Sequence, residues 1–70
     1  MNIGFARDSV NAGLSVRREG WTDNDKKILT ITKMVGKMPV RKKMMLEDGE
    51  LRDIILDGED FLAEDWIVTK

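Results

Sequence analysis

The sequence predicts a small single α+β domain: a short N-terminal helix, an antiparallel sheet with a β-hairpin, and a short helical turn before the C-terminal strand. Three observations predict it. Apolar residues recur at three- and four-residue steps near the N-terminus, β-branched residues concentrate mid-chain, and Asp48-Gly49 separates two strand-like segments. With 70 residues, the chain is expected to form one domain, residues 1–70.

The N-terminal segment predicts a helix from Ile3 to Asn11, because Ile3 and Val10 then lie on one face. Asn2 is expected to cap this helix, since its side-chain oxygen can accept a free amide of the first turn. Gly13 is expected to end it, because glycine readily adopts the left-handed conformation that terminates many helices.

Two strands are expected next, Leu14 to Arg18 and Lys27 to Val35, with a polar loop at Thr22 to Lys26 between them. The second strand is rich in β-branched residues, which favour sheets. In the first strand, Val16 and Arg18 point to the same side. An arginine in line with a core residue either extends past the edge of the core or lies in a polar pocket with a partner.

The chain is then expected to break at Gly36–Pro39, because proline cannot donate to a strand ladder and therefore marks a loop or a sheet edge. Val40 to Leu46 and Leu51 to Leu56 are expected to pair as a hairpin. The turn between them is Glu47–Glu50, and its Asp-Gly pair is a strong hairpin signal.

The C-terminal segment is expected to contain one or two helical turns at Glu59 to Asp65, because acidic residues favour a helix N-terminus. Trp66 to Thr69 is expected to form a terminal strand that pairs with an earlier one. Trp66 begins this strand and is assigned to the core.

The composition excludes several kinds of site. The chain has no cysteine and no histidine, so disulfides, thiolate metal sites and histidine general bases are impossible, and we expect no cofactor, no resident metal and no enzyme activity. A chain this small is usually stabilised by disulfides, metal or oligomerisation, which leaves oligomerisation. No apolar run approaches the ~20 residues that span a bilayer, so we expect a cytoplasmic protein without membrane contact.

Charge is unevenly distributed along the chain. Residues 33–43 carry five basic side chains and no acid, whereas residues 47–65 carry nine acids and one arginine. The two stretches are either solvated faces that prevent aggregation, or the basic stretch attracts an anion or the acidic stretch of a neighbouring subunit. The basic face is modest and aromatic residues are few, so no polymeric nucleic acid is expected as a partner.

Trp21 and Arg18 are the first candidate functional residues, because an aromatic face beside an arginine can stack a planar ligand while the arginine pairs with its phosphate. The alternative is that Trp21 caps the core. The carboxylates Asp60, Glu64 and Asp65 either serve acid–base chemistry or are helix-start acids on a solvated surface, and a carboxylate Mg²⁺ site stays open.

Two motifs at opposite ends of the chain resemble one protein family. Residues 1–21 contain Asn2-Ile3-Gly4-Phe5-Ala6 and later Val16-Arg17-Arg18-Glu19-Gly20-Trp21, and the tail contains Asp60-Phe61-Leu62-Ala63-Glu64-Asp65-Trp66. This pattern is similar to the small phage proteins of the second Thoeris anti-defence family. The resemblance implies a non-enzymatic sponge that binds a cyclic nucleotide-type immune signal, such as a cyclised ADP-ribose isomer or a cyclic oligonucleotide of CBASS-type defence.

The resemblance also implies a homo-oligomer, a dimer or a tetramer, with ligand pockets between protomers in the cytoplasm of an infected bacterium. It makes Trp21 the adenine-stacking residue, Arg18 a phosphate or carboxylate partner, and Asp60 a hydrogen-bond acceptor. Phe5, next to the helix start, is expected to line the same pocket. A cyclic dinucleotide carries two phosphates, and Arg41 and Lys43 are the residues expected to serve the second one. Two other functions remain open on the sequence: a protein–protein interaction module without nucleotide binding, and a metal-dependent enzyme that degrades the signal.

Overall fold

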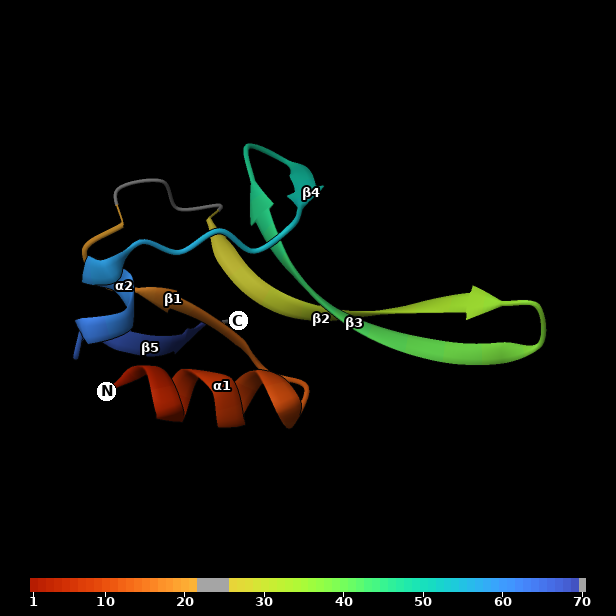
Figure 1. The fold of residues 1–70 in the computed structure, drawn as a ribbon, viewed down its shortest axis with the longest axis horizontal. Coiled ribbons are helices and arrows are strands. Elements are labelled where there is room, and N and C mark those ends of the chain that lie inside the picture. The colour runs from red at the N-terminus through yellow and green to blue at the C-terminus, as the bar shows by residue number, and fades with distance from the viewer. Residues whose placement is uncertain (22–25, 70) are drawn as a thin grey trace.

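The computed structural model describes residues 1–21 and 26–69, and places their strands in one antiparallel sheet of order β4-β3-β2-β1-β5 (Figure 1). A helix precedes the sheet and a shorter one precedes its last strand, which confirms the predicted α+β class. The predicted polar loop lies outside the described residues except for Lys26. In chain order the elements are α1 (Ile3–Asn11), β1 (Ser15–Arg18), β2 (Lys27–Val35), β3 (Met38–Glu47), β4 (Glu50–Arg52), α2 (Gly58–Leu62) and β5 (Trp66–Thr69).

Helix α1 has the bounds that the sequence predicts. The Asn2 side chain accepts the Phe5 amide at 3.0 Å, and Gly13 follows the helix with a φ of 92°, so both expected ends are confirmed. The buried face consists of Ala6, Ser9 and Val10. Among the described residues, no helix is long and apolar enough to cross a membrane.

Two hairpins build the centre of the sheet. The expected turn at Asp48-Gly49 is confirmed: both residues have positive φ, 54° and 78°, as a two-residue turn of this hand requires. The second hairpin joins β2 to β3 through Gly36, whose φ is 64°. There the predicted break is confirmed at Gly36 and Lys37, which form the turn after β2 ends at Val35, but it is wrong at Met38 and Pro39, because β3 begins at Met38. Pro39 is tolerated since β4 pairs only with Met45–Glu47, which leaves the outer edge of β3 open beside the proline, as the sheet-edge alternative expects.

Two predicted segments are too long. The hairpin strand expected to reach Leu56 ends at Arg52, because Ile54 and Leu56 turn inward and pack against the core instead of continuing the ladder. The helical turns expected to reach Asp65 end at Leu62, because Ala63 is already extended, with φ −67° and ψ 146°.

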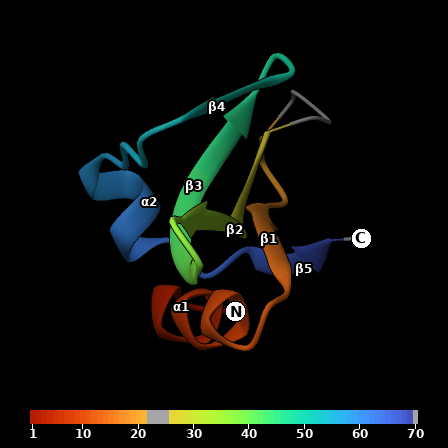
Figure 2. The same cartoon turned by 90° about the vertical axis from the view of Figure 1, so that its right-hand side faces the viewer.

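Both helices lie on the same side of the sheet, and the core lies between them and the strands (Figure 2). Trp66 is fully buried, which confirms its assignment to the core. An apolar cavity of about 220 Å³ remains under α1, bordered by Leu56 and by Phe61 of α2. The core consists of Ala6, Val10, Val16, Ile28, Met45 and Trp66.

The distal part of the β2–β3 hairpin extends away from this core as an arm, which we define as residues 32–43 (Figure 1). Every residue of the arm is exposed. Its strands pair only with each other, from Thr32 opposite Arg41 to Val35 opposite Met38. The arm therefore contributes to the length of the molecule, 39 Å against 24 and 23 Å, but not to its core.

Val16→Ala should lower the free energy of unfolding by about 2–3 kcal/mol, because Val16 is 1 % exposed and the deletion leaves a cavity. The matched control is Val68→Ala. Val68 lies directly opposite in the sheet but is 43 % exposed, so its loss should cost under ~1 kcal/mol. Urea denaturation at one protein concentration measures both values, and equal losses would contradict this account of the core.

Candidate ligand-binding site

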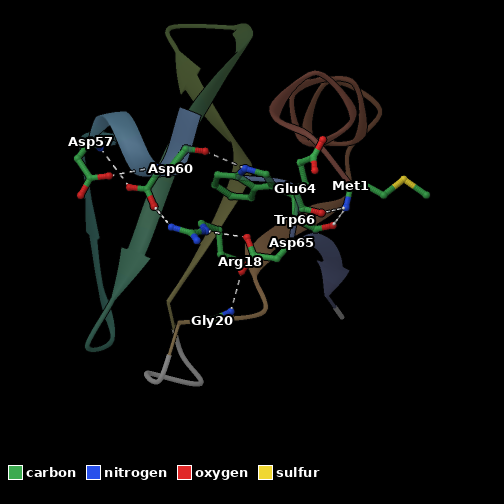
Figure 3. Close-up of polar contacts among 8 residues, drawn as sticks. All are labelled: Met1, Arg18, Gly20, Asp57, Asp60, Glu64, Asp65 and Trp66. Atoms are coloured by element: carbon green, nitrogen blue, oxygen red, sulfur yellow. Dashed lines mark hydrogen bonds and ion pairs between the residues drawn. The ribbon is translucent and has the colours of Figure 1, made fainter. Parts of the chain in front are cut away.

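Arg18 forms two ion pairs at the end of β1 (Figure 3). Its Nε donates to Asp65 Oδ1 at 2.8 Å, and its Nη1 donates to Asp60 Oδ1 at 2.9 Å. The side chain leaves the same face of β1 as the buried Val16, so the guanidinium enters a polar pocket rather than extending into solvent. Of the two alternatives that the sequence leaves open for Arg18, the structure shows the pocket with partners.

The two carboxylates are themselves held in place. Asp57 and Asp60 form a reciprocal capping box at the start of α2, with each side chain accepting the other's backbone amide at 3.0 and 3.1 Å. Asp65 Oδ2 accepts the Gly20 amide at 3.1 Å. Asp60 is a helix-start acid, as expected, but the expectation of a solvated surface is wrong for it, since it is only 8 % exposed. We call Arg18, Asp60 and Asp65 the arginine clamp.

The clamp keeps all three groups ionised at neutral pH. Burial acts to raise the pKa of Asp60, but the hydrogen bonds from Arg18 and from the Asp57 amide outweigh it and leave that pKa below its ordinary value. The hydrogen bond from Arg18 lowers the pKa of Asp65, against a smaller effect of desolvation. Hydrogen bonds to Asp65 and then Asp60 raise the pKa of the Arg18 guanidinium. With one guanidinium and two carboxylates, the clamp therefore carries a net charge of −1.

Trp21 follows the clamp through a tight turn in which its amide donates to the Arg18 carbonyl at 3.1 Å. Its ring meets Trp66 edge to face, with centroids 5.3 Å apart and planes at 79°. Lys26 Nζ lies 4.6 Å from the Trp21 ring centroid. Trp21 packs against the core but is only half-buried, so part of its indole stays accessible beside a cation.

Arg41 and Lys43 lie together in a second place, a shallow pocket of about 140 Å³ between the end of α1 and the β2–β3 hairpin. Asn11 and Thr30 complete its lining. Arg41 donates to the Asn11 carbonyl at 3.4 Å. Within residues 1–21 and 26–69, neither Arg41 nor Lys43 has an ion pair with a carboxylate. The pocket is therefore a small basic concavity suited to an anion.

The clamp and the basic pocket lie at different ends of the same sheet face. The register pairs Val16 with Ile28 and Thr30 with Lys43, so Arg18 and Lys43 are offset by about four strand residues, or ~13 Å. The core lies between them. One protomer therefore does not gather both sets of residues around a single cavity.

Of the residues singled out from the sequence, Arg18, Trp21 and Asp60 come together around Trp66, whose Nε1 donates to the Asp60 carbonyl at 3.1 Å. Phe5 is half-buried on α1 and belongs to neither group. Sequence reasoning named Asp65 only as a possible acid–base or surface carboxylate, not as a partner of Arg18, and it did not single out Lys26. The signals for them are an acid directly before the buried Trp66 and a cation a few residues after Trp21. In the described part of the chain, no cluster of three acids is placed to hold a metal ion.

The stability of the protein should fall as the pH drops from about 5 through the lowered pKa values of Asp60 and Asp65. A carboxylate whose pKa is depressed by folding contributes stability above its unfolded pKa, near 3.8, and loses it when protonated. Asp60→Asn and Asp65→Asn should lower stability at pH 7 and flatten this acid dependence. Asp8→Asn removes an exposed carboxylate and should leave the slope unchanged. Thermal melts from pH 3 to 7 measure the slope, and an unaltered slope in both clamp variants would contradict the linkage.

Comparison with known proteins agrees with the motifs at the two ends of the chain. The model of the Thoeris anti-defense 2-like (Tad2-like) domain matches residues 1–69. The match therefore includes the clamp, Trp21 and the basic pocket. No curated protein matches the chain. Because the match extends over nearly the whole sequence, the chain belongs to the Thoeris anti-defense 2-like family, and this membership implies a role in phage anti-defence against Thoeris.

Proposed function

We propose that this protein binds a cyclic nucleotide-type immune signal and withholds it from the host without cleaving it. The observation that carries the proposal is Trp21, a half-exposed indole held against the core beside a cation in a family with an anti-defence role. An indole held in place stacks a base without losing side-chain entropy on binding. The ligand class is a cyclised ADP-ribose isomer or a cyclic oligonucleotide.

In this proposal the arginine clamp positions Trp21 instead of binding phosphate directly. Two guanidinium nitrogens of Arg18 are already engaged by Asp60 and Asp65, and the Asp65 carboxylate also holds Gly20, the residue before Trp21. The phosphates of the ligand meet Arg41 and Lys43, whose charges are free of carboxylate partners in the described residues.

A second protomer completes the site. Pockets that bind small molecules usually measure ~300–1,000 Å³, and the basic pocket of about 140 Å³ is smaller. The core also separates this pocket from Trp21. One protomer therefore cannot enclose a nucleotide between the Trp21 ring and the basic side chains of the pocket. We therefore place the ligand between protomers of a homo-oligomer, where Trp21 of one faces Arg41 and Lys43 of another.

Sequestration fits the chemistry of the site better than catalysis. The chain has no histidine or cysteine, and the carboxylates nearest Trp21 are already engaged by Arg18 and by backbone amides. An acid or base for hydrolysis needs a free group near the reacting bond with a pKa close to the working pH. The lowered pKa values of Asp60 and Asp65 move these carboxylates away from that range.

Trp21→Ala should weaken nucleotide binding about ten- to hundredfold, because one base stacked on an aromatic ring contributes ~1–3 kcal/mol. Trp21→Phe keeps an aromatic face and should bind more tightly than the alanine variant. Calorimetry against cyclised ADP-ribose isomers, cyclic dinucleotides and cyclic trinucleotides measures the affinities. Mass spectrometry of the ligand released by heat denaturation should recover it intact. A cleaved product would contradict sequestration, and folded wild-type protein that binds nothing would favour an interaction module.

Arg41→Ala and Lys43→Ala should each weaken binding about tenfold and reduce its dependence on salt, because each removes a phosphate partner. Lys42→Ala is the matched control. Lys42 lies between them in β3 but points to the opposite face of the sheet and pairs with Asp53 at 3.8 Å, so its loss should leave the affinity unchanged. Three equal effects would show that net charge alone, and not the basic pocket, attracts the ligand.

A further inference from the structure

The cavity of about 220 Å³ under α1 has no part in the function proposed above. Three parts of the fold surround it: one face of α1, the core strands, and the chain between β4 and α2 together with α2 itself. Its apolar lining includes Val10, Val16 and Ile28 on the side of the core, and Ile54, Leu56 and Phe61 on the outer side. The cavity thus lies against the centre of the fold, separate from the basic pocket and from Trp21.

The lining of this cavity is suited to hydrocarbon and not to water. A buried water molecule needs two to four polar partners, and the apolar side chains around the cavity offer none. An apolar cavity of ~150 Å³ in another protein binds benzene, which has six carbons. By the same ratio of volume to carbon, the larger cavity under α1 has room for an apolar chain of about eight carbons.

The outer wall of the cavity connects it to the surface. Phe61 is 55 % exposed, and Ile54 and Leu56 are half-buried. Ile55, between these two, is 79 % exposed and is not part of the lining. Ile54 and Leu56 belong to no helix or strand, since β4 ends at Arg52. A ligand can therefore enter past these side chains without breaking the sheet.

Two basic side chains mark the rim of the cavity, Arg7 from α1 and Lys43 from β3, and both are exposed. Lys43 lies on the same face of β3 as the buried Met45, so its hydrocarbon stem lines the cavity while its amine reaches solvent. Among the described residues Lys43 has no ion pair, and Arg7 has only an exposed one with Asp8 at 3.4 Å, which contributes little. The rim therefore attracts a negative charge.

We propose that this cavity binds a free medium-chain fatty carboxylate. The tail, about eight carbons long, lies between α1 and the outer wall, and the carboxylate lies at the rim between Arg7 and Lys43. The apolar lining selects the tail and the two cations select the charge, so both halves of the ligand are recognised. The inference goes beyond the proposed function, because it uses neither Trp21 nor nucleotide binding. A ligand that binds only the folded chain also raises the melting temperature.

A series of ligands tests the size of the cavity and the part played by the charge. Calorimetry should show that octanoate binds about fifteenfold more tightly than hexanoate, because two more methylenes leave water. Decanoate should gain less than about threefold over octanoate, because its last carbons exceed the cavity. Octanol has the same tail without the charge and should bind about tenfold more weakly than octanoate, because it lacks the attraction to both cations.

Filling variants test the location of the tail. Leu56→Trp places a larger side chain in the cavity and should weaken octanoate binding at least tenfold, and Ile54→Phe is a second variant of this kind. Ile55→Trp is the matched control: its side chain is exposed outside the lining, so the affinity should stay unchanged. Circular dichroism verifies that each variant is folded.

Rim variants test the location of the carboxylate. Arg7→Gln and Lys43→Gln should each weaken octanoate binding about three- to fivefold and leave octanol binding unchanged, because an exposed charge pair contributes up to ~1 kcal/mol. Lys42→Gln is the control for net charge, since Lys42 points to the opposite face of the sheet.

Methyl NMR spectra of the wild-type protein complete the test. Octanoate should shift the methyl signals of Val10, Val16 and Ile28 and leave those of Val35 and Val40, on the arm, in place. Folded protein that binds no octanoate at about 5 mM, octanol that binds as tightly as octanoate, or an unchanged affinity of both filling variants would overturn the inference.

Two other occupants of the cavity have their own signatures. Methyl signals of the cavity that respond to protein concentration but not to octanoate would show that a second copy of the chain covers it. Signals that respond only to a cyclic nucleotide would assign the cavity to the nucleotide. Either result would overturn the inference, whereas protein that binds octanoate and no nucleotide would contradict only the proposed function.

Discussion

The double ion pair of Arg18 is the interaction on which the rest of the structure depends. Its partners come from the far end of the sequence, Asp60 from α2 and Asp65 from the residue before β5. The clamp therefore fixes the C-terminal segment against β1 while Trp66 fills the core beside it. Removing one member of a partly buried ion pair leaves the others without compensation, which is costly in a domain with a core this small.

The same clamp explains why Trp21, the residue that we propose stacks a base, is held in place although it is partly exposed. Asp65 holds Gly20 by its second oxygen, and Trp66 receives the edge of the Trp21 ring. The alternatives posed for Trp21 by the sequence are thus compatible, because one edge of the indole packs on the core while the ring remains partly exposed. An aromatic platform fixed in this way is pre-organised for a planar ligand.

Local signals predicted the parts of the fold that depend on neighbours in sequence. Helix α1, β2, β5 and the Asp48-Gly49 turn follow from periodicity, β-branching and turn chemistry. The β2–β3 hairpin was not predicted because Pro39 indicated a loop or a sheet edge. In the structure Pro39 lies within β3, where β4 does not pair with the outer edge of the strand. The partners of Arg18 could not be predicted, since they lie 42 and 47 residues away and no periodic pattern relates positions so distant. Membership of the family was predicted from the motifs that contain these same residues.

The small size of the domain is one reason for proposing that more than one protomer completes the site. Residues 32–43 form an arm that adds nothing to the core of its own chain. A domain of 70 residues buries little surface, so the loss of these residues from the core matters for its stability. A two-stranded hairpin alone is only marginally stable in water, and this one leaves Met34, Val35 and Met38 exposed. In the function that we propose, a second protomer completes the site, so neither protomer needs a large cavity of its own, and the basic pocket is indeed small. A short chain can in this way enclose a ligand larger than any pocket that its own core could surround.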